Sequence, residues 1–328
     1  MIVGINGFGR IGKNIFKILL ERKILVGMIN DPIIDLKYIL YTLKHDSTYV
    51  NNGITAMECE GGIMVNNNFI AISHEKEPSK IHWKSQKVDF VVEASGIFNS
   101  FEGANKHDAK RIICTGPSKD IKMVVHGINQ HEIDFSKEKT IISAASCTTN
   151  CIVPILKIIN DKYDIISGSF NSIHALTISQ STVDKYNKNY RLGRSCFNII
   201  PSTTGASDAI ECVLPEMKNK IKGIATRVPV IDVSMVDLNL LLKKEVENIE
   251  EICKEIQINS EKYKNVLSYT VESVVSSDLI GNPFSCVVDV NASLLINNKF
   301  IKIVCWYDNE HAYSCRVVDL MEFIVSKK

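Results

Sequence analysis

The sequence predicts an α/β protein of two domains, the first built on a doubly wound parallel sheet and the second an α+β domain with a mostly antiparallel sheet. Through the first half, short β-branched runs alternate with helical ones, beginning with 2–5, 11–21 and 24–29. Strand, helix and strand in this order imply a parallel sheet wound by right-handed crossovers. Beyond the middle of the chain, long runs with two-residue periodicity appear, which is typical of antiparallel strands.

Length, composition and charge exclude several classes of protein. The 328 residues are enough for one large or two ordinary domains with a well-buried core. Apolar residues make up 45% and charged residues 23%, the average for a soluble globular protein. The formal net charge of +1 gives no support to a general nucleic-acid or membrane-surface role. No apolar run is long enough to span a bilayer.

The cysteines and the N-terminus bear on the cellular compartment. The ten cysteines include no CxxC pair and no regular spacing, which fits reduced thiols better than a disulfide framework or a zinc site. The chain opens with MIVGINGFG, a strand and turn from the first residue, which argues against a signal peptide. We therefore expect a cytoplasmic protein without a metal site.

Further short runs complete the predicted first domain. Strands are expected at 88–93, 111–114, 123–125 and 140–143, and a helix at 36–43. Asn66, Asn67 and Asn68 separate the apolar runs 63–65 and 69–72, which predicts a hairpin inserted in the alternating plan.

The second half begins with a predicted helix at 151–159 and continues with long strands. These strands are expected at 168–178, 222–230, 233–242, 285–291 and 300–307. The segment 181–197 is polar, basic and weakly periodic, and a long excursion of this kind is usually functional. The last segment, 310–325, is again helical. Because the sequence contains no flexible linker, we expect the two domains to join near position 147.

A glycine pattern stands between the first strand and the first helix. Gly7-Phe8-Gly9-Arg10-Ile11-Gly12 is a GxGxxG motif, in which Gly7 makes the tight turn, Gly9 admits a pyrophosphate and Gly12 allows close helix packing. The helix N-terminus adds free backbone N–H groups and a partial positive charge. Without context the motif is weak, because a glycine-rich turn occurs equally without a ligand.

An acidic residue in the expected place supports a dinucleotide site. Asp31 ends the second strand, 19 residues after Gly12, where a carboxylate accepts hydrogen bonds from an adenosine ribose. The same carboxylate would repel a 2′-phosphate, which favours NAD over NADP. The alternative role of Asp31, a turn former before Pro32, does not predict this spacing.

The stretch SAASCTTNC, residues 143–151, places Cys147 where a strand ends and a helix begins. Its small, polar neighbours suit the approach of a charged ligand. A helix N-terminus and a nearby imidazole both activate a thiol, and His174, in the strand-like NSIHALTIS, is the best candidate for the imidazole. An isolated cysteine is more often inert, and a strand histidine more often structural. Cys151, one helical turn further on, is expected to be a packing residue.

Together these motifs resemble glyceraldehyde-3-phosphate dehydrogenase. The blocks that carry the resemblance run in order along essentially the whole chain: GINGFGRIG (4–12), NDP (30–32), SCTTNC (146–151), NIIPSTTGA (198–206), RVPV (227–230), and WYDNE with YSCRVVDL (306–320). The combination of SCTTNC with WYDNE is highly specific. The resemblance implies a Rossmann NAD-binding domain at 1–146, completed by a C-terminal helix at about 310–328, and a catalytic domain at 147–309. It also implies a homotetramer.

The resemblance implies a reaction. Cys147 would attack the aldehyde carbon of D-glyceraldehyde 3-phosphate, and His174 would serve as general acid and base on the hemithioacetal oxygen. Hydride transfer to NAD would leave a thioester on Cys147, and inorganic phosphate would release the acyl phosphate, 1,3-bisphosphoglycerate. The family's cofactor site corresponds to Gly7, Gly9, Arg10, Ile11, Gly12, Asp31 and Asn309. Of these, Asn309 matches the residue that holds the nicotinamide carboxamide, and Tyr313 is expected nearby.

Two phosphate subsites are implied as well. Ser146, Thr148, Thr204 and Gly205 match the site for the attacking phosphate, and Thr177 with Arg227 match the site for the substrate's own phosphate. Arginine suits this task because its fork presents several donors to phosphate oxygens. The sequence TTGA at 203–206 equally predicts a capped helix start, and the two roles are compatible.

Some positions depart from the family's usual pattern. His311-Ala312 replaces Trp-Gly after WYDNE, and Lys185-Tyr186 replaces Gly-Pro after Val183-Asp184. The excursion is also one residue short near 191–197, so either Arg191 or Arg194 serves the phosphate site, and we prefer Arg191 slightly. No chemical group that the reaction needs is missing.

Two alternatives remain open at this point. Erythrose-4-phosphate dehydrogenase uses the same cysteine but ends in hydrolysis rather than phosphorolysis. A non-catalytic relative would use Cys147 as a redox-sensing thiol and bind RNA, for which the basic, tyrosine-containing stretch 185–194 offers a surface. The neutral net charge favours a solvated subunit-contact loop instead, so we do not expect nucleic acid as the primary ligand.

Overall fold

The computed structural model describes residues 1–50 and 53–327. The chain divides into two compact units. The first comprises Met1–Ala145 with Ser314–Lys328, and the second comprises Ser146–Tyr313. The division falls directly before Ser146 and Cys147, so the residues around the cysteine belong to the second unit.

The first unit contains an eight-stranded sheet in the order β3-β4-β5-β2-β1-β6-β7-β8. Its strands are β1 (Ile2–Asn6), β2 (Leu25–Asn30), β3 (Ala56–Cys59), β4 (Gly62–Val65), β5 (Asn68–Ser73), β6 (Phe90–Glu93), β7 (Arg111–Cys114) and β8 (Thr140–Ser143). Strands β5, β2, β1, β6, β7 and β8 are parallel to one another. Strands β4 and β5 form the predicted antiparallel hairpin, and β3 pairs antiparallel with β4 at the edge of the sheet. The strand order reverses beside β1, which confirms the doubly wound, Rossmann-type prediction.

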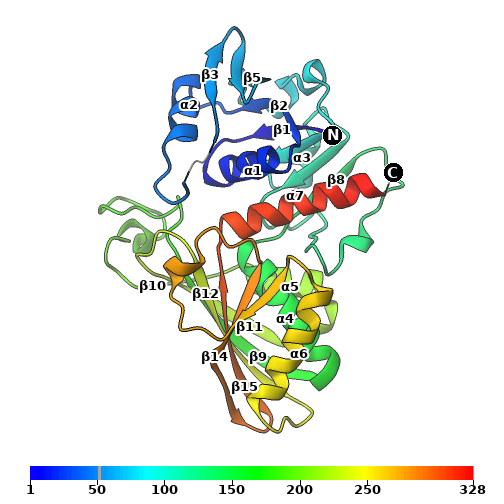
Figure 1. Cartoon of the computed structure of the whole chain (residues 1–328), viewed down its shortest axis with the longest axis vertical. Helices are drawn as coiled ribbons and strands as arrows, with labels where there is room; N and C mark the ends of the chain where they lie inside the picture. Colours follow the sequence, from blue (N-terminus) through cyan, green and yellow to red (C-terminus); the bar gives the residue numbers. More distant parts are fainter. Residues whose placement is uncertain (51–52, 328) are drawn as a thin grey trace. The chain divides into compact units, whose positions relative to one another are not determined.

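Helices flank this sheet: α1 (Arg10–Glu21), α2 (Leu36–Lys44), α3 (Phe101–Asn105) and α7 (His311–Ser326), of which α7 begins in the second unit. Helix α1 packs on β1 and β2, as Figure 1 shows in dark blue. It presents Ile15, Phe16, Ile18 and Leu19 to the core, each at most 2% exposed. This apolar stripe at helical spacing keeps the start of α1 fixed beside the end of β1.

The second unit contains a seven-stranded sheet in the order β10-β11-β9-β12-β15-β14-β13. Its strands are β9 (Ile165–His174), β10 (Ile200–Ser202), β11 (Ile221–Arg227), β12 (Ser234–Leu242), β13 (Leu267–Thr270), β14 (Cys286–Asn297) and β15 (Phe300–Tyr307). Strands β9 and β11, and β13 and β14, are parallel, and the other neighbours are antiparallel. This confirms the mostly antiparallel prediction.

Helices α4 (Cys147–Tyr163), α5 (Ala206–Val213) and α6 (Ile249–Lys262) gather on one face of this sheet (Figure 1). The alternation of β12 explains why that face is apolar: Val236, Leu238, Leu240 and Leu242 are all fully buried. Residues between them are partly exposed on the opposite face.

Three predicted strands are missing or end early in the structure, and a fourth, predicted at 285–291, continues to Asn297 as β14. The run 123–125 is buried but forms only an isolated bridge from Met123 to Ser143, because the Val125 N–H donates to the Asn129 side chain. Strand β9 stops at His174, although the alternating pattern continues to Ile178, which is 95% exposed. Strand β11 ends opposite His174 at Arg227, before the predicted 230. Beyond that point the two segments stay linked by hydrogen bonds from the Val228 N–H to the His174 carbonyl and from the Leu176 N–H to the Val230 carbonyl, but neither is a strand.

Candidate active site

Cys147 is the first residue of α4, and the residue before it caps the helix. The Ser146 hydroxyl accepts a hydrogen bond from the Thr149 N–H at 3.1 Å, and the Asn150 amide donates to the Ser146 carbonyl at 2.9 Å. Thr148, Thr149 and Asn150 are buried, whereas Cys147 is partly exposed. The thiol therefore lies at the positive end of a helix of 17 residues, where a developing negative charge is stabilised.

The structure brings Cys147 and His174 together. Cys147 Sγ lies 3.6 Å from His174 Nε2, although the two residues are 27 positions apart. His174 Nδ1 lies 2.7 Å from the Ala175 carbonyl oxygen, which can only accept, so Nδ1 carries the proton. Nε2 therefore presents its lone pair to the thiol. This tautomer is the one that a general base for Cys147 requires.

Burial sets the charge state of this pair. Burial raises the pKa of the Cys147 thiol, against the opposing effect of hydrogen bonds from Thr148. Burial, followed by the charge of Arg227, lowers the pKa of His174 to about 4. Both shifts favour the neutral forms, a thiol beside an imidazole whose Nε2 lone pair faces the sulfur.

Arg227 lies beside this pair with hydrogen-bonding capacity left over. It ends β11 directly opposite His174 in the parallel register of β11 and β9. Its Nε and Nη1 atoms are buried and have no acceptor among the described residues. Burial lowers the pKa of the guanidinium. Buried donors without acceptors favour the binding of an anion, which makes Arg227 a candidate anion-binding residue.

Tyr307, the last residue of β15, was not singled out from the sequence. Its hydroxyl lies 2.9 Å from both Thr148 Oγ1 and Ser172 Oγ, and its ring packs edge-on to His174. Burial raises the pKa of Tyr307, so it stays a neutral hydroxyl. Tyr307 thus fixes Thr148 from 159 positions away, a contact that no local pattern predicts.

Asn309 is joined to the end of β9 through one hydroxyl. The Ala175 N–H donates to Ser234 Oγ at 3.0 Å, and Ser234 Oγ donates to Asn309 Oδ1 at 2.7 Å. Because Oδ1 is the acceptor in this chain, the amide nitrogen of Asn309 is left to donate elsewhere. Ser234 was also missed, since a serine at the start of a strand carries no signal by itself. Tyr313, four residues on, is buried.

The remaining predicted anion-binding residues lie on two loops. Thr177 follows β9, and its hydroxyl lies 3.0 Å from that of Ser179. Gly205 is the N-cap residue of α5 and a Cβ there would meet nothing within 4 Å, while Thr204 Oγ1 accepts from the Ala206 N–H at 3.2 Å. The helix start predicted for TTGA is therefore present, but no side chain of its N-cap residue caps it, and space remains beside Gly205.

The long excursion places its two arginines differently. Arg191 lies in a short 3-10 helix, Tyr190–Gly193, and its Nη1 lies 3.4 Å from the Pro201 carbonyl oxygen on β10, the strand before Thr204. Arg194 instead lines a surface hollow with Lys185 and Tyr186. This placement favours Arg191 as the arginine on the side of Thr204.

The glycine motif of the first unit has the geometry of a dinucleotide cradle. Gly7 has φ +92°, and a Cβ there would lie 2.6 Å from the Ser95 nitrogen. A Cβ on Gly12 would lie 2.0 Å from the Gly7 carbonyl oxygen, so α1 packs directly on the turn. A Cβ on Gly9 would meet nothing within 4 Å, which leaves the backbone open to a ligand. Asp31 accepts from the Phe8 N–H at 2.8 Å and so ties the cradle to β2.

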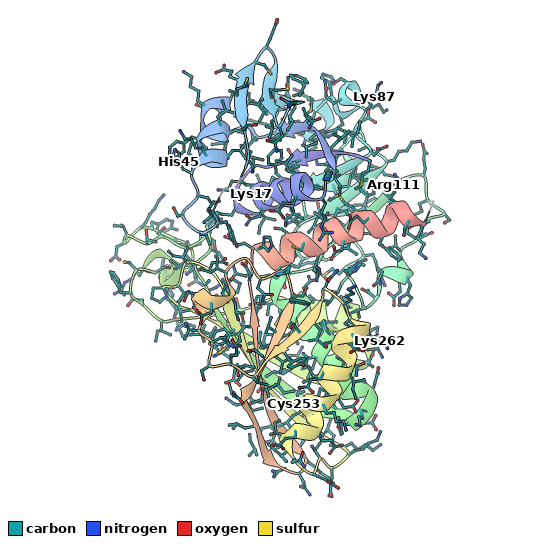
Figure 2. All side chains as sticks on the ribbon, viewed as in Figure 1. Lys17, His45, Lys87, Arg111, Cys253 and Lys262 are labelled. Carbon is teal, nitrogen blue, oxygen red and sulfur yellow. The ribbon has the colours of Figure 1, made fainter. Side chains whose placement is uncertain are left out.

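The side chain of Arg10 is engaged away from the cradle. It donates to Asp46 at 2.9 Å, as do Lys13 at 2.8 Å and Lys17 at 3.0 Å. Figure 2 labels Lys17 on α1. Burial opposes ionisation of Asp46, but the hydrogen bonds from these groups and from Thr48 hold its pKa well below the usual range. At the first turn of α1, Arg10 and Ile11 therefore contribute backbone N–H groups.

Several other features bear on the chemistry. All ten cysteines are free thiols. Among residues 1–50 and 53–327, no group of three or more His, Cys, Asp or Glu side chains is placed to hold a metal ion. Within the same residues, each helix is too short or too polar to cross a membrane.

Comparisons with known proteins agree with this geometry. The family model for the glyceraldehyde 3-phosphate dehydrogenase NAD binding domain matches residues 1–101, and the model for the C-terminal domain of the same family matches residues 146–309. A glyceraldehyde-3-phosphate dehydrogenase 1 of Kluyveromyces lactis is 43% identical over 98% of this chain and 99% of its own. A cytosolic glyceraldehyde-3-phosphate dehydrogenase of Gracilaria gracilis is 43% identical over 98% and 97%. One from Glossina morsitans morsitans is 39% identical over 99% and 98%.

Proposed function

This chain belongs to the glyceraldehyde-3-phosphate dehydrogenase family, and from that premise we propose that it oxidises D-glyceraldehyde 3-phosphate and joins the product to inorganic phosphate, yielding 1,3-bisphosphoglycerate in glycolysis. It is an NAD-dependent dehydrogenase. The observation that carries the proposal is the 3.6 Å approach of Cys147 Sγ to the lone pair of His174 Nε2, next to the unpaired donors of Arg227.

The residues present fit NAD. The open backbone at Gly9, the first turn of α1 and the Asp31 carboxylate would hold its pyrophosphate and adenosine ribose. The Asn309 amide nitrogen would donate to the nicotinamide carboxamide, since its oxygen is held by Ser234. When bound, NAD supplies the hydride acceptor of the oxidation.

Cys147 would supply the nucleophile of the reaction, and His174 would transfer the protons. Cys147 Sγ bonds to the aldehyde carbon while its proton passes to His174 Nε2 and on to the former carbonyl oxygen, giving a hemithioacetal. As hydride leaves the carbon, His174 removes the hydroxyl proton, so the oxygen becomes the carbonyl of a thioester on Cys147. A phosphate oxygen then attacks the thioester carbon and the Cys147 thiolate departs. The proton that His174 holds returns to the sulfur or leaves to solvent.

Two groups of residues would bind the two phosphates. Arg227 and Thr177 would hold the substrate's phosphate, because the guanidinium has donors to spare. The attacking phosphate would use the Ser146 and Thr148 hydroxyls with the α5 start at Thr204 and Gly205, joined by Arg191 from the excursion. Tyr307 supports the second group by holding Thr148.

Phosphate dependence tests this function. Purified protein receives D-glyceraldehyde 3-phosphate and NAD, with and without inorganic phosphate, and formation of NADH is followed by absorbance. We expect sustained turnover only with phosphate, and its loss in Cys147→Ser. The matched control is Cys212→Ser, an exposed free thiol in the same unit, which should leave the rate unchanged.

The same assay distinguishes the alternatives. Sustained turnover without phosphate would indicate a hydrolytic enzyme of the erythrose-4-phosphate dehydrogenase type. A folded protein that binds NAD but gives no turnover would indicate the non-catalytic, thiol-sensing type. The comparisons favour glyceraldehyde-3-phosphate dehydrogenase function over both.

Self-association and cellular location complete the proposal. Apolar side chains in and next to the excursion are widely exposed: Ile178 at 95%, Val183 at 80%, Tyr186 at 81%, Phe197 at 90% and Ile199 at 73%. Such a concentration is unusual on a monomer and supports the homotetramer. Light scattering during size-exclusion chromatography would measure the mass, and a monomer would contradict it. The cytosolic relative supports a cytoplasmic location.

A further inference from the structure

A row of polar side chains crosses the first sheet at the carboxyl ends of its strands. Glu93, Asn6, Asn30 and Ser73 end β6, β1, β2 and β5, and the parallel register places each opposite the next. Glu93 and Asn30 are fully buried and Asn6 is 3% exposed. Hydrogen bonds run from Asn6 Nδ2 to Glu93 Oε2 at 2.6 Å, from Asn30 Nδ2 to Asn6 Oδ1 at 2.7 Å, and from Ser73 Oγ to Asn30 Oδ1 at 2.7 Å.

The direction of the hydrogen bonds identifies Glu93 as the final acceptor. Trp83 Nε1 donates to His107 Nδ1 at 3.1 Å, so the imidazole proton lies on Nε2, which donates to Glu93 Oε2 at 2.9 Å. The other oxygen, Oε1, accepts from the N–H of Ser95 at 2.8 Å and from its hydroxyl. Four donors converge on one carboxylate that is removed from solvent.

Three residues of the row, Asn6, Asn30 and Glu93, are joined directly to parts of the cofactor cradle. Asn6 precedes the Gly7 turn, Asn30 precedes Asp31, and Glu93 holds Ser95, whose backbone lies against Gly7. Backbone bonds reinforce the link, from the Gly7 N–H to the Asn30 carbonyl at 2.8 Å and from the Ala94 N–H to the Asn6 carbonyl at 2.7 Å. Ligands of doubly wound sheets bind at this edge, where the strand order reverses.

We propose that Glu93, oriented by Trp83 and His107, is a positioning residue for NAD: its carboxylate holds the Gly7 turn and Ser95 in the geometry that receives the cofactor. Apolar residues would pack this part of the sheet without the cost of burying a charge. A fully connected polar row instead fixes one arrangement of backbone, which is what a dinucleotide cradle needs. The inference rests on the proposed function only in taking NAD as the ligand.

Glu93→Gln tests the proposal with nearly the same side-chain shape. The new amide nitrogen of the variant would face either the donors of His107 and Asn6 or the donors of Ser95. Because two donors cannot form a hydrogen bond with each other, at least one of the present hydrogen bonds would be lost. We expect the dissociation constant for NAD, measured by calorimetry, to rise about tenfold or more. At saturating NAD, kcat should stay within about threefold of wild type, because the positioned groups serve binding. Glu132→Gln, which neutralises an exposed carboxylate of the same unit, is the matched control and should shift NAD binding less than twofold.

A second pair of variants decides the matter if Glu93→Gln does not fold. His107→Gln keeps a donor within reach of Glu93 and should bind NAD within about threefold of wild type, whereas His107→Leu removes it and should bind about tenfold more weakly. Equal NAD affinity in the two His107 variants, or unchanged affinity in folded Glu93→Gln, would overturn the inference. A wild-type protein that bound no NAD would overturn the proposed function itself, and the inference with it.

Discussion

The polar networks of the two units differ in how many of their hydrogen-bonding groups lack a partner. Around Glu93 in the first unit, each carboxylate oxygen, amide and imidazole nitrogen already has a partner. Around Cys147 in the second unit, Arg227 keeps two buried donors without acceptors among the described residues, and the thiol meets a bare lone pair. A network whose groups are all paired holds backbone in place, whereas buried donors without partners favour the binding of a ligand.

Removing the lone pair of His174 should have the largest effect on the unsaturated network. In His174→Asn we expect kcat to fall on the order of 10²- to 10⁴-fold, because the thiol proton and the hydroxyl proton lose their acceptor. Alkylation of Cys147 by iodoacetamide should slow in parallel. NAD affinity should stay unchanged, and a variant that lost cofactor binding while keeping kcat would contradict the assignment of His174 to the reaction.

The buried histidine should also make stability depend on pH. The pKa of His174 is lowered to about 4 by burial and by Arg227, whereas in the unfolded chain it is about 6.5. The unfolded state therefore binds the proton first as pH falls, so stability is present above 6.5 and is lost towards 4. The loss should amount to at most about 3 kcal/mol.

Denaturant unfolding of the wild type and of His174→Asn at several pH values measures this loss. The difference between the two curves should grow between pH 6.5 and 4, since only the wild type carries the titrating group. Parallel curves would show that the imidazole is not held neutral in the folded protein.

Substitution of Arg227 tests whether its unpaired donors bind the phosphate of the substrate. Arg227→Leu should raise KM for D-glyceraldehyde 3-phosphate and lower kcat/KM about 10- to 100-fold, the cost of losing charge-assisted hydrogen bonds to a phosphate. Lys222→Met removes an exposed cation from the same strand, where it pairs with Glu211, and should change kcat/KM less than about twofold. An equal loss in both variants would mean that general charge, and not a defined subsite, is responsible.

Tyr307→Phe tests a fully hydrogen-bonded group within the second unit, for comparison with the unpaired donors of Arg227. Its hydroxyl serves Thr148 and Ser172, so we expect the free energy of unfolding to fall by about 1–2 kcal/mol. KM for inorganic phosphate should rise severalfold while KM for the aldehyde changes little. Thermal unfolding and initial rates measure the two effects, and an unchanged KM for phosphate would limit Tyr307 to a role in stability.

Contacts between residues close together in the sequence can be predicted from it, whereas contacts between residues on distant strands cannot. The turn at Gly7, the packing at Gly12 and the place of Asp31 follow from spacing within one strand-helix-strand unit, and the structure has them there. Residue type and local pattern make His174 the best candidate partner of Cys147, the family resemblance assigns the pair its chemistry, and the structure gives the 3.6 Å distance. The contacts between Thr148 and Tyr307 and between Asn6 and Glu93 form only because particular strands become neighbours. No local sequence pattern predicts which strands pair or in which register.

The chain from Ala175 through Ser234 to Asn309 has a stereochemical consequence. Each hydrogen bond in this chain has one donor and one acceptor in a defined order. The carbonyl oxygen of Ala175 accepts a further hydrogen bond, from the Nδ1–H of His174. Turning the amide over would exchange this hydrogen bond for one from Nδ2 to Ser234 Oγ and leave the hydroxyl proton without its acceptor. If Asn309 holds the nicotinamide carboxamide through its nitrogen, the hydrogen bond from Ser234 would favour one orientation of that carboxamide, and with it one face of the ring towards the substrate.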